Sequence, residues 1–77
     1  MTIEQLRAFH HAMPFEPFTI HLADGRSYDV PHRDFLSHSH SGRTIYVTRP
    51  DDSLGIIDLL LVTDLVIHRT AAPSNGQ

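Results

Sequence analysis

The chain has 77 residues, no cysteine, seven histidines, nine carboxylates and six cationic residues that are all arginine, for a formal charge of −3. So short a chain forms a single domain near the lower size limit for a core without cross-links, and the lack of cysteine excludes disulfides and thiolate metal sites. The negative charge excludes a broad basic surface for nucleic acid at neutral pH.

The start of the chain has no cationic segment leading into an apolar run, and no stretch is long and apolar enough to cross a membrane. We therefore expect a cytoplasmic protein without membrane contact, and no motif indicates a cofactor. If all seven histidines titrated near a pKa of about 6.5, the formal charge would move from −3 to −3 + 7 = +4 on acidification. The histidine content reflects either pH sensing or compositional bias.

Residues 2–13 predict a helix, because Thr2 and Gln5 have the spacing of a capping box. Its apolar stripe comprises Ile3, Leu6, Phe9 or His10, and Met13. Pro14 is expected to end the helix, and Pro17 stiffens the connector that follows.

Residues 18–30 predict the central β-hairpin. Phe18, Ile20 and Leu22 alternate with polar residues, and Asp24-Gly25 supplies a tight turn. Tyr28 and Val30 continue the alternation on the returning strand.

Pro31 interrupts this second strand, and a turn or short helical segment with Phe35 and Leu36 as buried anchors is expected next. The polar residues 37–42 are expected to finish as a short strand. Residues 44–48 and 54–58 predict two antiparallel strands around a turn at 50–53.

The apolar stretch 56–67 has two interpretations. It is either a strand ending at Asp58, a helical turn over 59–62 and a strand from Asp64, or a continuous helix. The β-branched residues near its end favour the first interpretation. Residues 70–77 lack core-forming side chains and are expected to be disordered.

Together these elements predict a single domain over residues 1–69 that is mainly β with one N-terminal helix. The fold expected is a five-stranded, strongly bent antiparallel sheet or a small open barrel. The alternating segment 20–28, with Asp24 before Gly25 and an apolar residue three positions on, resembles the first motif of the Sm-like and Hfq-like proteins. The strand, turn and strand over 57–65 is similar to their second motif.

This resemblance covers residues 3–69 and implies RNA binding by a ring of subunits. The sequence departs from the family at three places: Val30-Pro31 replaces a glycine that bends the second strand, the connection to the third strand is several residues longer, and Asp58-Leu59 replaces a basic residue. The family's RNA-binding residues therefore have no direct counterparts, and an SH3-type barrel fits the strand count nearly as well.

Histidines at i and i+2 of a strand share a face, so His38 and His40 form a candidate metal site with Asp34 or His32 as third ligand. The alternative is a solvated flank of the hairpin, which we prefer, and we assign no metal ligand. Serines 37, 39 and 41 lie too close in sequence to the histidines for a nucleophilic triad, and we assign no catalytic residue.

Arg26, Arg43 and Arg49 flank predicted turns and could bind RNA or another anion, since guanidinium groups suit phosphate; alternatively they are simply solvated. If Ile45, Val47, Leu54 and Ile56 face the core, alternation leaves three apolar side chains outside as an oligomer interface: Tyr46, Ile57 and Val66. The expected function is a homo-oligomeric binding or scaffold module of unknown ligand, with RNA or a protein as its partner. The alternative is an RNA-binding ring, and an enzyme is the least expected class.

Overall fold

The structure is a computed structural model that describes residues 1–68. It contains a helix and six strands: α1 (Ile3–His10), β1 (Phe18–Leu22), β2 (Ser27–Val30), β3 (Leu36–His38), β4 (Thr44–Thr48), β5 (Leu54–Asp58) and β6 (Val62–Ile67). Two short 3-10 turns, η1 (Arg33–Phe35) and η2 (Leu59–Leu61), separate β2 from β3 and β5 from β6.

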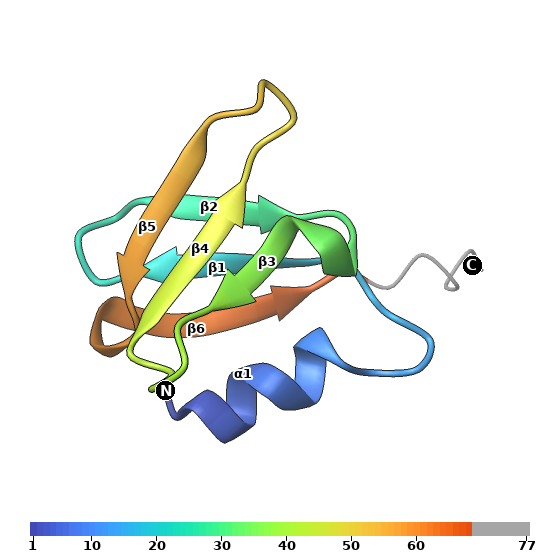
Figure 1. Ribbon diagram of the computed structural model, residues 1–77, viewed down its shortest axis with the longest axis horizontal. Coiled ribbons are helices and arrows are strands. Elements are labelled where there is room, and N and C mark those ends of the chain that lie inside the picture. Colours follow the sequence, from blue (N-terminus) through green and yellow to red (C-terminus); the bar gives the residue numbers. More distant parts are fainter. Residues whose placement is uncertain (69–77) are drawn as a thin grey trace, which may run out of the picture.

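The strands form two antiparallel sheets in the orders β2-β1-β6 and β3-β4-β5. Figure 1 shows the second sheet crossing the first, with α1 along one side of the pair. A mainly β fold with an N-terminal helix is thus confirmed, whereas the single five-stranded sheet or barrel is wrong. The strands do not form one continuous sheet, because the chain is interrupted each time it passes from one sheet to the other. Pro31 and η1 lie between β2 and β3, and η2 lies between β5 and β6.

The predicted central hairpin is confirmed. Phe18 pairs with Val30 and Ile20 with Tyr28 across β1 and β2. Gly25 has φ +94°, the left-handed conformation that this turn requires. β1 also pairs with β6 on its other side, so it is the central strand of its sheet.

The helix begins as predicted, with Thr2 and Gln5 forming both bonds of a capping box. It ends at His10 rather than Met13, since Pro14 has no amide to bond the His10 carbonyl. The guanidinium of Arg33 donates to the carbonyls of His10 and Ala12 instead. His10 is buried and its Nε2–H donates to the carbonyl of Arg33 at 2.9 Å. His10, and not the exposed Phe9, therefore completes the buried stripe.

The core lies between the two sheets, where Phe18, Ile20, Val30, Ile45 and Val47 are fully buried. The prediction that Ile45 and Val47 of β4 face the core is confirmed.

The predicted facing of β5 is wrong. Ile57 is 1% exposed, while Leu54 and Ile56 are 56% and 64% exposed. The inward positions of β5 are Gly55 and Ile57, because the ring of Tyr28 occupies the space where a side chain at position 55 would lie.

The strand, turn and strand interpretation of the apolar stretch is confirmed. Asp58 caps η2 by accepting a hydrogen bond from the Leu60 amide, and β6 begins at Val62, two residues earlier than predicted. The predicted tail 70–77 and the boundary at 69 lie outside the described residues. Within residues 1–68, α1 is too short to span a bilayer.

We expect Gly25→Val to lower the free energy of unfolding by about 1–3 kcal/mol, because a β-branched residue is strained at positive φ. No atom lies within 4 Å of the added Cβ, so the cost is backbone strain rather than a clash. Urea unfolding followed by circular dichroism measures it. Gly25→Asn is the control, since asparagine tolerates this conformation, and equal stability of the two variants would contradict the assignment.

Candidate functional site

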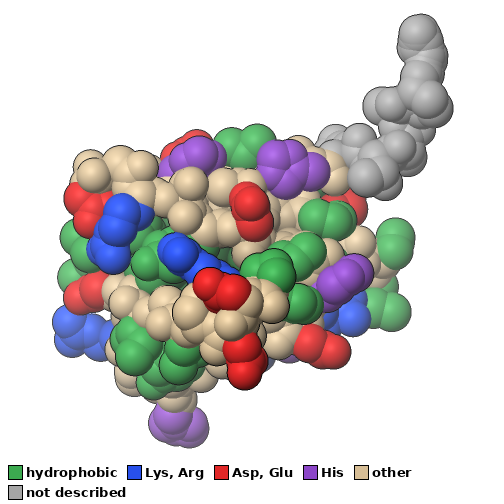
Figure 2. All heavy atoms as spheres, turned by 90° about the horizontal axis from the view of Figure 1, so that it is seen from above, with side chains coloured by type: hydrophobic (Ala, Val, Ile, Leu, Met, Phe, Trp, Pro, Cys, Tyr) green, Lys and Arg blue, Asp and Glu red, His purple; other side chains and the backbone are tan. Residues whose placement is uncertain are grey.

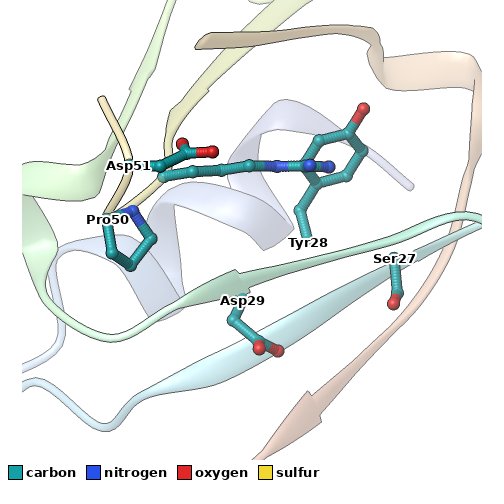
Figure 3. A pocket seen from close by; sticks show the side chains of 6 residues that line it. Ser27, Tyr28, Asp29, Pro50 and Asp51 are labelled. Atoms are coloured by element: carbon teal, nitrogen blue, oxygen red, sulfur yellow. The ribbon is translucent and has the colours of Figure 1, made fainter. Parts of the chain in front are cut away.

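The most structured candidate site is a groove of about 440 Å³ between β2 and the turn that joins β4 to β5. We call it the Tyr28 groove; it is lined by Ser27, Tyr28, Asp29, Arg49, Pro50 and Asp51. Figure 3 shows Tyr28 projecting from one face of β2 and Ser27 and Asp29 from the other, with Pro50 and Asp51 to the left of the ring. Three consecutive residues can line one groove only where it runs along the edge of their strand, since successive side chains point to opposite faces.

Arg49 is held over the ring of Tyr28, with the guanidinium carbon 4.5 Å from the ring centroid. This distance is that of a cation–π contact. The turn that presents Arg49 is rigid: Pro50 fixes its own φ, Asp52 adopts φ +71°, and the Arg49 amide bonds to the Ser53 carbonyl. Stacking and turn together fix the plane of the guanidinium.

The carboxylates of the groove accept hydrogen bonds from other groups, whereas Arg49 contacts the Tyr28 ring and acts on Asp51 only through its charge. Asp51 accepts hydrogen bonds from the amide and hydroxyl of Ser53, and these bonds lower the pKa of its carboxyl. Asp29 accepts a 2.7 Å bond from the hydroxyl of Thr19. In residues 1–68, no carboxylate lies within ion-pairing distance of Arg49 and its guanidinium has no hydrogen-bond acceptor.

The structure brings together two of the three predicted anion-binding arginines. Arg26 reaches the hydroxyl of Tyr28 at 3.4 Å but forms an ion pair with Asp24 at 2.8 Å. Arg43 precedes β4 and Arg49 follows it, so they lie at opposite ends of that strand. Figure 2 shows arginines and carboxylates interspersed on the face that carries the β4–β5 turn, rather than a continuous basic surface.

A second polar arrangement crosses the outer face of the sheet β2-β1-β6. The Thr19 hydroxyl lies 2.7 Å from both Asp29 Oδ1 and His68 Nε2. Because the carboxylate can only accept, the hydroxyl donates to Asp29 and itself accepts from Nε2–H of His68. An imidazole that is protonated at this nitrogen cannot take the threonine proton, so the arrangement is not that of a nucleophile and its base.

Sequence reasoning missed both the Tyr28 groove and this polar row. The row joins residues 49 positions apart. The only indication in the sequence was that polar side chains occupy alternate positions of the predicted strands. The groove depends on the close approach of Gly55 to Tyr28. A pattern of apolar residues does not reveal such an approach, because glycine has no side chain.

His38 and His40 do not form a metal site with Asp34 or His32. The described residues 1–68 contain no group of three or more potential ligands close enough to hold an ion. β3 ends at His38, so the two imidazoles are not on one strand face, and His38 Nδ1–H donates to the Ser39 carbonyl. The Ser39 hydroxyl is paired with the Ser41 hydroxyl and the Thr44 amide rather than with an imidazole.

The predicted interface residues lie in three different places. Ile57 is buried in the core, Val66 is exposed on β6, and Tyr46 is partly buried on the outer face of β4 opposite Ile56. The exposed apolar side chains nearest to Tyr46 are Leu54 and Ile56, with Leu60 following on η2. We call Tyr46, Leu54 and Ile56 the β5 surface.

Comparisons of the chain with protein-family models, with curated proteins and with solved structures each find no match. The Sm-like resemblance therefore rests on the two motifs and on the order of the elements.

We expect Gly55→Ala to reduce stability by about 1–3 kcal/mol, because its Cβ would lie 2.5 Å from Cε2 of Tyr28 and the packed ring must shift. Thermal unfolding measures the loss, and near-ultraviolet circular dichroism reports the displaced tyrosine. The matched background is Tyr28→Ala, in which the same glycine change should cost little. Equal costs in both backgrounds would show that the contact does not restrain β5.

We expect Ser53→Ala to raise the pKa of Asp51 towards its usual value of 3.8, because the largest cause of the lowered pKa is the bond from the Ser53 side chain. A carboxyl with a lowered pKa stabilises the fold above its unfolded pKa and loses this contribution as pH falls through the folded pKa. The variant should thus be less stable at neutral pH, with the difference vanishing in acid. Carbon-13 NMR titration measures the pKa, and Asp24, which is bonded to Arg26, should titrate unchanged.

Proposed function

We propose that this protein is a non-enzymatic, homo-oligomeric binding or scaffold module that assembles through the outer edge of β5. The observation that carries the proposal is the exposure of Leu54 and Ile56, at 56% and 64%, on a strand that pairs on one side only. A small domain that leaves such side chains in water gains free energy by covering them.

The free edge of β5 also presents unpaired backbone groups. The Arg49 amide bonds to the Ser53 carbonyl and the Leu59 amide to the Arg43 carbonyl, so odd-numbered residues of β5 face β4 in the ladder. Antiparallel ladders alternate, and the amides and carbonyls of Leu54 and Ile56 therefore point away from β4. The same two residues supply apolar side chains and backbone groups to a partner.

A second copy of this edge is a complementary partner. Two β5 strands running antiparallel about a two-fold axis at Ile56 would place Leu54 of each opposite Asp58 of the other, at the two ends of the contact. The carboxylates are then kept apart, and Ile56 meets its own copy at the centre. The two three-stranded sheets would become one continuous six-stranded sheet.

We propose that the order of the elements is Sm-like, although the strands form two three-stranded sheets rather than one barrel. A helix precedes the strands, a 3-10 turn joins the last two, and the last strand returns to pair with the first. These features support the resemblance seen in the two sequence motifs. Ile57 belongs to the protomer core and takes no part in the proposed contact, whereas Tyr46, which pairs with Ile56, borders it.

We expect light scattering coupled to size exclusion to give at least twice the monomer mass of 8.7 kDa at micromolar concentration. Ile56→Lys should yield a folded monomer, because edge lysines disfavour strand pairing.

The control is Val66→Lys, which places the same charge on an exposed valine of the other sheet and should leave the oligomer intact. A monomeric wild type would refute the proposal, and dissociation by Val66→Lys alone would move the interface to the sheet β2-β1-β6.

A further inference from the structure

We propose that the Tyr28 groove binds an extended, otherwise uncharged segment of a partner protein that carries one glutamate or aspartate, which adds to the edge of β2 as a further strand and places that carboxylate on Arg49. This inference rests on β2 and on the β4–β5 turn, and it does not depend on assembly through β5.

The first requirement of strand addition is a free edge, and β2 has one. β2 pairs only with β1 in the sheet β2-β1-β6. The Leu22 amide bonds to the Arg26 carbonyl, so the ladder bonds of β2 to β1 are made by even-numbered residues. The amides and carbonyls of Ser27 and Asp29 therefore point into the groove, where an added strand can bond to them.

The second requirement is a group that selects one side chain of the added strand, and the guanidinium of Arg49 is that group. The added residue opposite Tyr28 would occupy a non-hydrogen-bonded pair, in which the two side chains approach closely on one face. That face carries the Tyr28 ring and the Arg49 guanidinium stacked 4.5 Å above it. Within residues 1–68 the Arg49 guanidinium forms no ion pair. A planar guanidinium matches a carboxylate with two parallel hydrogen bonds, so the fitting side chain is glutamate or aspartate.

The same surroundings disfavour a nucleic acid. One face of the Tyr28 ring is covered by Arg49 and is closed to base stacking. Arg26 is held by Asp24, and a phosphate chain along the groove would pass Asp29 and Asp51. A single carboxylate on Arg49, with uncharged backbone over the rest of the edge, avoids these repulsions.

The test is a nitrogen-15 NMR titration of the full chain with a capped pentapeptide of alternating threonine and valine that has a central glutamate. A peptide with central glutamine is its match. We expect the glutamate peptide to shift the amides of Ser27 and Asp29 and to bind about fivefold more tightly than the glutamine peptide. Equal affinity for both peptides, or shifts confined to other strands, would overturn the proposal.

Two variants and one control separate the contact with Arg49 from the addition of a strand to β2. Arg49→Gln should abolish the preference for glutamate, while Arg43→Gln, which removes a charge at the other end of β4, should keep it. Ser27→Pro removes an amide that points away from β1, so no bond to β1 is broken. This variant should weaken the binding of both peptides equally. Retention of the glutamate preference in Arg49→Gln would overturn the proposal even if Ser27→Pro failed to fold.

Two further probes distinguish other ligands. Inorganic phosphate at the peptide concentration should leave Ser27 and Asp29 unshifted; shifts as large as those of the peptide would identify a simple anion site instead. A short uridine-rich RNA should not bind in physiological salt, and tighter binding of this RNA than of the glutamate peptide would favour an RNA-binding module over the proposal. Repeating the titration on Ile56→Lys separates peptide binding from assembly through β5.

Discussion

The contact between Gly55 and the ring of Tyr28 is the constraint on which both candidate surfaces depend. A Cβ at position 55 would lie 2.5 Å from the ring, so β5 can cross β2 at this point only with a glycine there. The crossing fixes the facing of β5: Gly55 and Ile57 point inward, and Leu54 and Ile56 point outward. It also fixes the Tyr28 ring as the platform on which Arg49 rests. The exposed β5 surface and the Tyr28 groove are therefore two consequences of one close approach.

The sequence determines the local structure of this domain well. The capping box at Thr2, the hairpin turn at Gly25 and the turn at Pro50 are each set by neighbours within a few residues, and all three were predictable from turn and cap chemistry. The apolar alternation of β1 and β2 likewise gave their core faces. Such features require no knowledge of which strands meet.

Features that depend on contacts between distant segments were not predictable. An alternation pattern counts Leu54 and Ile56 as core because they are apolar and gives no weight to glycine at the inward position. Arg33, 23 residues from His10, bonds the carbonyl that the end of the helix leaves free. The surroundings of Arg49 also depend on distant contacts, because its guanidinium lies over the ring of Tyr28 and Asp29 is bonded to Thr19.

The free edges of the two sheets differ in how they are protected. Natural sheets guard their edges with charge, proline or short length, because an open edge pairs with any other extended chain. β3 is short, with three residues, and the edge of β2 lies beside Asp29, Arg49 and Pro50. β5 carries no charged side chain before Asp58, which is itself engaged in capping η2. An edge flanked by charged side chains favours a partner that pairs with those charges, which agrees with the proposed selective peptide binding at β2. An apolar edge without charges gains free energy when it is covered, which agrees with the proposed self-association at β5.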